Sequence, residues 1–172
     1  MQNCSILKNI CLTALLAAVP VLSAASLNSA DRQFLINAAR TDMIEAHEGQ
    51  MAENQAMRSD VKDFGKTLVD DHTQSYEQLT ALAAKEGVPI PKGINAAKDP
   101  AVESLMHLNG EKFDHSFAND EVAAHRRALA TFKREAMSGH DADIKAYASQ
   151  MIPTLEKHLH LAEECAKSAR RT

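Results

Sequence analysis

The sequence has no tryptophan, and phenylalanine and tyrosine together make up only 4% of its 172 residues. It also lacks a glycine-rich phosphate-binding loop, a glycine–serine linker, a low-complexity tract and any alternating pattern typical of a β-strand. Alanine, leucine, glutamate, lysine and methionine are common instead. This composition excludes a strand-rich fold and favours helices that pack through small and aliphatic side chains.

Positive charge is scarce and scattered. The formal net charge is -4, and the one basic cluster, Lys167 to Arg171, stands near the end of the chain. Basic residues at that place complement the C-terminal end of a helix. Because no basic surface is present, we do not expect a nucleic-acid partner.

The N-terminal segment differs from the rest of the chain. Lys8 precedes an almost wholly apolar run over residues 10–22, and small residues follow at Ser23, Ala24 and Ala25. This pattern predicts a secretory signal peptide over residues 1–25, cleaved after Ala25. The alternative is an uncleaved membrane anchor, for which the run is short, because a span needs about 20 apolar residues. We therefore expect export to the periplasm, with or without association with the cell envelope.

Cysteine is nearly absent from the exported part. Cys4 and Cys11 lie inside the predicted signal peptide, which leaves Cys165 as a single thiol. One cysteine cannot form an internal disulfide, so the core must hold the fold together. Cys165 lies on the apolar stripe of its helix, which favours a buried, unreactive thiol over an intermolecular disulfide or a metal ligand.

Residues 26–172 are enough for one domain with a sizeable core. Asp31 can cap a first helix, and Asp99 followed by Pro100 marks the start of a third, with a possible weak point at Asn109 and Gly110. Pro153 should kink the fourth helix or loosen one of its turns. The expected helices cover about residues 32–57, 59–86, 100–137 and 141–169.

The second and third helices are joined by one long connection, Gly87 to Lys98. Fully extended it would reach roughly 40 Å, so it could cross the whole bundle or stay at one end. The other connections are short, which makes neighbouring helices antiparallel. The sequence therefore predicts an all-α, antiparallel four-helix bundle of the ferritin-like kind.

Each predicted helix has an ionisable residue in the middle of its apolar stripe. A titratable group on an apolar face needs a partner there. Counted along the helix axis from the connecting turn, the glutamate of the first helix lies at the same level as the histidine of the second. The same count places a glutamate of the third helix beside a histidine of the fourth. These candidate metal-site residues are Glu45, His72, Glu121, His125 and His158.

A Glu–His set can hold iron, manganese, zinc or copper. In ferritin-like di-metal sites two helices also carry Glu-x-x-His. Here Val69 and Leu155 stand where those glutamates would be; Asp71, on the flank of its stripe, and Asp42, near Glu45, could each contribute a carboxylate instead. A full di-iron oxidase centre is therefore not expected.

Three interpretations of these residues stay open: a hydrogen-bonded network without a ligand, a metal or small-ligand site, and catalysis. The other histidines offer less. His47, His140 and His160 are expected to point outward or lie at a turn, whereas His107 and His115 fall in a poorly periodic stretch.

Phe34 follows Asp31 by three residues, Gly49 follows Glu45 by four, and Val69-Asp70-Asp71-His72 comes later in the chain. The order and spacing of such motifs resemble domain-of-unknown-function family 4142 over Asp31 to Ala166. The family implies a ferritin-like helical fold and export, and it brings no established activity. The residues that carry the resemblance are Asp31-x-x-Phe34, Ala38-Ala39, Glu45-x-x-x-Gly49, Val69-Asp70-Asp71-His72, Leu82-Ala83-x-x-x-Gly87-x-x-x-Pro91, Phe113-Asp114, His125 and Ile152-Pro153-x-Leu155-x-x-His158-Leu159.

Two functions are compatible with these features. The first is a non-enzymatic exported bundle that acts in binding or stress protection. The second is a degenerate ferritin-like metal protein with a buried Glu/His site. A single-metal oxidoreductase would use the same residues, but no complete catalytic constellation supports an enzyme.

Overall fold

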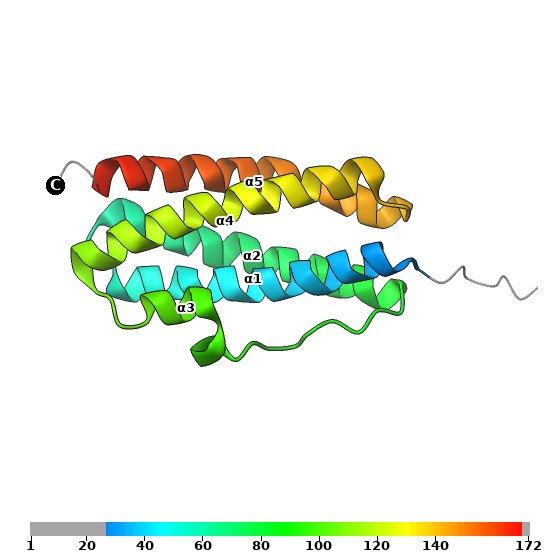
Figure 1. Ribbon diagram of the computed structural model, residues 1–172, viewed down its shortest axis with the longest axis horizontal. Helices are drawn as coiled ribbons and strands as arrows, with labels where there is room; N and C mark the ends of the chain where they lie inside the picture. The colour runs from blue at the N-terminus through cyan, green and yellow to red at the C-terminus, as the bar shows by residue number, and fades with distance from the viewer. Residues whose placement is uncertain (1–26, 170–172) are drawn as a thin grey trace, which may run out of the picture.

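A computed structural model describes residues 27–169 and confirms the all-α fold (Figure 1). The predicted signal peptide lies outside the described residues. No described helix is long and apolar enough to cross a membrane. The helices are α1 (Ser29–Gln55), α2 (Ser59–Lys85), the 3₁₀ turn η1 (Ala96–Lys98), α3 (Pro100–Leu105), α4 (Gly110–Ser138) and α5 (Ala142–Ala169).

Four long helices form two hairpins, α1–α2 and α4–α5, which lie side by side (Figure 1). The connection after α2 runs along the outside of the bundle toward its opposite end, where α4 begins (Figure 1). This crossover settles the alternative that the sequence left open, and it keeps neighbouring helices antiparallel. The bundle is therefore of the kind that the sequence predicts.

The third predicted helix is divided in two. Asp99 Oδ1 accepts a hydrogen bond from Ala101 N at 3.1 Å, the expected cap, but α3 ends at Leu105. Gly110 has a φ of 60°, a conformation that favours glycine. Gln55 Nε2 also donates to Leu108 O at 2.7 Å, which holds the segment between α3 and α4 against α1. The weak point at Asn109 and Gly110 is thus a true interruption.

The ends of the two hairpins are tied by buried aspartates. The prediction that Asp31 caps its own helix is wrong, because Asn28 Oδ1 accepts from Ala30 N and Asp31 N. Asp31 instead accepts from the backbone N–H groups of His140 and Asp141 in the opposite hairpin turn. Asp114 makes the equivalent contact with the α1–α2 turn, accepting from Met57 N and Arg58 N at 3.0 and 3.1 Å.

The core consists of two apolar clusters with a polar layer between them. One cluster gathers around Phe34, Leu79 and Tyr147, and the other around Phe64 and Phe117. Apart from Asp31 and Asp114 at the hairpin ends, the buried polar residues of each long helix fall between the segments that contribute to the two clusters. The fold thus places polar side chains from four helices at one level of the bundle.

Cys165 belongs to the second cluster and is buried, as predicted. Its Sγ lies 3.7 Å from Asp60 O, within the hydrogen-bond range of a thiol. Burial, with the nearby Asp60 carboxylate, raises the pKa of the Cys165 thiol to about 12. The thiol is therefore protonated at neutral pH and unsuited to nucleophilic or redox chemistry.

Candidate metal centre

All five predicted site residues lie in the polar layer and are almost completely buried, with at most 5% of any residue exposed. They do not form a single cluster. The structure brings them together as two overlapping groups that share one histidine. The first group is His72, His125 and His158, and the second is Glu45, Glu121 and His125.

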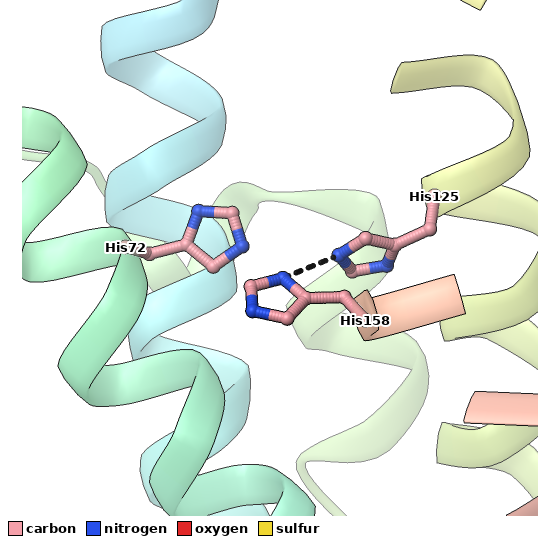
Figure 2. A group of neighbouring side chains, drawn as sticks. All are labelled: His72, His125 and His158. Atoms are coloured by element: carbon pink, nitrogen blue, oxygen red, sulfur yellow. Dashed lines mark hydrogen bonds between the residues drawn. The ribbon is translucent and has the colours of Figure 1, made fainter. Parts of the chain in front are cut away.

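The three histidines come from α2, α4 and α5, and their rings face a common point (Figure 2). Each offers one nitrogen, and these nitrogens lie within 4.8 Å of one another. His125 Nε2 and His158 Nδ1 are 3.2 Å apart. His72 Nε2 is buried and has no hydrogen-bond partner among the described residues.

An oxygen acceptor lies behind each ring. His72 Nδ1 donates to Asp42 Oδ1 at 2.9 Å, and His158 Nε2 donates to Asp71 Oδ2 at 2.9 Å. His125 Nδ1 donates to the backbone carbonyl of Glu121 at 3.1 Å. The two carboxylates favour a proton on the outer nitrogens of His72 and His158, whereas His125 has a hydrogen-bonding neighbour at each of its nitrogens.

The predicted Glu–His pairs are wrong. His72 pairs with Asp42 and not with Glu45, whereas His158 pairs with Asp71 and not with Glu121. Equal distance from a turn sets the axial level of two side chains, but it does not say toward which neighbouring helix each one points. Asp71, predicted to flank its stripe, is half-buried and reaches across to α5.

The electrostatics keep His158 neutral. Burial, together with the neighbouring His72, lowers the pKa of His158 to about 3, although the hydrogen bond to Asp71 acts in the opposite direction. For Asp71, burial acts to raise the pKa, but hydrogen bonds from His158 and Lys157 outweigh it and lower the pKa. An ionised Asp71 therefore faces a neutral imidazole.

The lowered pKa leaves His158 neutral, so with its Nε2 donating to Asp71 its inner Nδ1 carries a lone pair. His158 Nδ1 lies 3.2 Å from His125 Nε2, where it can accept a hydrogen bond from that nitrogen or bind a cation in its place (Figure 2). Their 3.2 Å separation is that of two nitrogens bound to one ion at about 2.1 Å each. Even at 4.8 Å sides, the centre of the triangle lies about 2.8 Å from each nitrogen, so small side-chain movements complete a metal site.

The carboxyl groups in the layer are strongly perturbed. Burial, with the neighbouring Glu121 carboxyl, raises the pKa of Glu45 to about 8. Burial likewise raises the pKa of Glu121 well above its ordinary value, with Glu48 acting in the same direction. Both groups are therefore predominantly uncharged at neutral pH unless a cation compensates their charge.

Several polar residues of the layer were not singled out as site residues from the sequence. Asp42 Oδ2 accepts from Ser75 Oγ at 2.9 Å, and Ser75 Oγ lies 2.8 Å from the Tyr147 hydroxyl. Asp42 precedes Glu45 by three residues, so the same helical periodicity that found Glu45 could have found it. Ser75 offers no comparable signal.

The other histidines lie outside the layer. His140 and His160 are exposed as predicted, and His47 is half-buried. His107 and His115, which the sequence left unassigned, are exposed. Only three of the eight histidines therefore contribute to the candidate centre.

Comparison with known proteins identifies the family. Residues 16–165 match the model of a domain of unknown function, DUF4142. The chain belongs to this family. Among solved structures, a DUF305 fragment from Deinococcus radiodurans is similar, with a TM-score of 0.71 and 14% sequence identity. The similarity covers 84% of this chain and 99% of the fragment, and at this identity it supports the helical fold alone.

No curated protein matches the chain. Membership of DUF4142 confirms the resemblance that the sequence motifs indicate and brings no activity with it. The chemistry of the polar layer must therefore be argued from its own geometry.

Proposed function

We propose that this DUF4142 protein binds a transition-metal ion through His72, His125 and His158. One observation carries the proposal: each of the three rings has an oxygen acceptor at its outer nitrogen, and the inner nitrogens converge to within 4.8 Å of one another. Acceptors behind metal-binding histidines fix the tautomer and raise the basicity of the ligand nitrogen.

The donor set indicates the class of ion. Three neutral imidazoles suit zinc, copper, nickel or iron, whereas magnesium and calcium prefer oxygen ligands. Asp42 and Asp71 lie behind two of the rings and offset the positive charge of such an ion. The site thus supplies both the ligands and the balancing charge.

Binding fits the site better than catalysis does. The three rings are buried between two apolar clusters, and none of them lines either cavity found among the described residues. We propose a non-enzymatic metal-binding role, such as storage or protection against metal stress, in an exported protein.

Metal titration of the protein, purified without a histidine tag and stripped with a chelator, tests this proposal. We expect one equivalent of Zn²⁺ or Cu²⁺ to bind tightly, and His158→Gln to weaken that binding at least 100-fold. His160→Gln is the matched control, because His160 is exposed on the same helix and should bind metal as the wild type does. Sub-stoichiometric iron, manganese, copper and zinc after both oxidising and anaerobic reconstitution would overturn the proposal.

A further inference from the structure

We infer that Glu45, Glu121 and His125 form a second cation site, of different chemistry, beside the three-histidine site. The inference rests on the proposed function only through His125, which both sites share. Each of the three residues offers one ligand atom, and these atoms lie within 4.8 Å of one another. The site takes a cation that prefers oxygen ligands with a single imidazole, namely Mn²⁺ or Fe²⁺.

Two orphaned oxygen atoms point to a missing ligand. Glu45 Oε2 and Glu121 Oε2 are buried without a hydrogen-bond partner among the described residues, although the two side chains interact with each other and His125 Nδ1 lies 3.2 Å from Glu121 Oε2. Leaving such atoms unsatisfied costs free energy, and no lysine or arginine of the described chain forms an ion pair with either carboxylate within 4.0 Å. A bound cation would satisfy both oxygens at once.

His125 is placed to serve both sites with different nitrogens. Its Nε2 faces His158, whereas its Nδ1 lies 3.2 Å from Glu121 Oε2. Nδ1 lies 3.1 Å from the Glu121 backbone carbonyl, so a cation that binds Nδ1 releases the proton of that nitrogen to solvent, and with both nitrogens bound to cations His125 is an imidazolate. His125 would then bridge an imidazole-rich site and a carboxylate-rich one.

The carboxylate site also has a route to solvent. A groove of about 840 Å³ runs between α1 and α4, and Glu45 lies in its lining together with Glu48 and Asp120. Acidic side chains along a groove raise the local concentration of cations. Arg127 also lines the groove and interacts with Asp120, so the acidic end near Glu45 is the end that favours cations.

Parallel titrations with Mn²⁺ and Zn²⁺ separate the two sites. Mn²⁺ binding can be followed by its electron paramagnetic resonance signal, and Zn²⁺ binding by competition with a chromophoric chelator. We expect Glu45→Gln to weaken Mn²⁺ binding at least tenfold while Zn²⁺ affinity stays within about threefold. His72→Gln should weaken Zn²⁺ binding at least tenfold and leave Mn²⁺ affinity within about threefold. Glu53→Gln, at an exposed position, should change neither affinity.

Glu45→Gln should fold, because glutamine resembles the protonated carboxyl that burial favours. Glu121→Gln provides a second test with the same expected loss of Mn²⁺ affinity. Absence of Mn²⁺ binding by the wild type, or Mn²⁺ binding that neither glutamate variant weakens, overturns the second site. An equal loss of Mn²⁺ affinity in Glu45→Gln and His72→Gln also overturns the second site, because Glu45 and His72 would then belong to one site.

Failure of the proposed function has another signature. If His72→Gln leaves Zn²⁺ affinity unchanged while Glu45→Gln abolishes Mn²⁺ binding, the three-histidine site is absent and the carboxylate site stands.

Discussion

His72 and the exposed His160 have the same side chain but different surroundings. His72 is 3% exposed and has the Asp42 carboxylate behind its ring. Asp42, on α1, in turn accepts from Ser75 on α2, which contacts Tyr147 on α5. Contacts among three helices therefore hold the Asp42 side chain in place. The hydrogen bonds behind the rings, and not the histidines alone, define the candidate centre.

Asp42→Asn tests this support directly. The amide can still accept from His72 and contact Ser75, but it lacks the negative charge that balances a bound ion. Because loss of such a partner typically weakens metal binding by about 10- to 100-fold, we expect a loss of that size in Zn²⁺ affinity. Asp70→Asn, in an exposed i,i+4 pair with Lys66, is the control. Unchanged affinity in Asp42→Asn would show that the His72–Asp42 contact is unrelated to metal.

Glu48 gives the protein an unusual dependence of stability on pH. Burial, reinforced by Glu45 and Asp99, raises the pKa of Glu48 from 4.5 to about 8. The folded state therefore holds a proton that the unfolded state releases, and this contribution to stability is lost as pH rises toward and through 8. The contribution of His158, whose pKa is lowered, is fully present above pH 6.5 and does not change in this window.

We expect the metal-stripped protein to lose about 1–2 kcal/mol of unfolding free energy from Glu48 between pH 6.5 and 8. Chemical denaturation at several pH values measures this loss, and Glu48→Gln should flatten the dependence. Part of the pH dependence of the unfolding free energy should remain in Glu48→Gln, because the raised pKa of Glu45 acts in the same direction. Stability that is constant or rises over this range would contradict the buried, protonated state of Glu48.

At the scale of elements, the first hairpin depends on the close approach of two helices. A Cβ added at Gly49 would lie 2.5 Å from Gly65 O, and one at Gly65 would lie 2.6 Å from the Ala52 Cβ. The backbones of α1 and α2 thus touch next to the polar layer, as the position of Gly49 on its buried face predicts. Separating them would also move Asp42 away from His72.

Gly49→Ala should therefore destabilise the fold by about 1–3 kcal/mol, since backbone must shift to admit the methyl group. Gly93→Ala is a matched control, because a Cβ at Gly93 meets nothing within 4 Å. Thermal unfolding of the two variants measures the difference. Equal melting temperatures would show that α1 and α2 are not packed as closely as described.

The helices and the inward direction of all five site residues could be predicted from periodicity, because an apolar stripe records which face is buried. The hydrogen-bond partners of these residues could not be predicted from the sequence. Asp42 and Glu45 share a stripe, and only the packing of neighbouring helices decides which of them meets His72. The break before Gly110 was visible only as a weak point, because the Gln55 contact that stabilises it comes from another helix.

At the scale of the whole molecule, two apolar clusters enclose a polar layer. Burial of carboxyl and imidazole groups costs free energy that the clusters must offset. An ion that binds only the folded state adds stability in proportion to the logarithm of its concentration. If the proposed metal binding holds, the layer would weaken the bundle without metal and strengthen it with metal.

Export is also a property of the whole chain and stays a prediction from the N-terminal segment. When the full sequence is expressed in a bacterial host, we expect the protein in the periplasmic fraction with Ser26 as its first residue. N-terminal sequencing after fractionation measures both. A chain that retains residues 1–25 and sediments with the membrane would support the uncleaved anchor instead.

X-ray absorption spectroscopy of the protein with one equivalent of Zn²⁺ is the most direct test of the three-histidine site. We predict imidazole nitrogens at about 2.0–2.1 Å, with three of them fitted to the first shell. A first shell of oxygen atoms without imidazole scattering would contradict the metal centre formed by His72, His125 and His158.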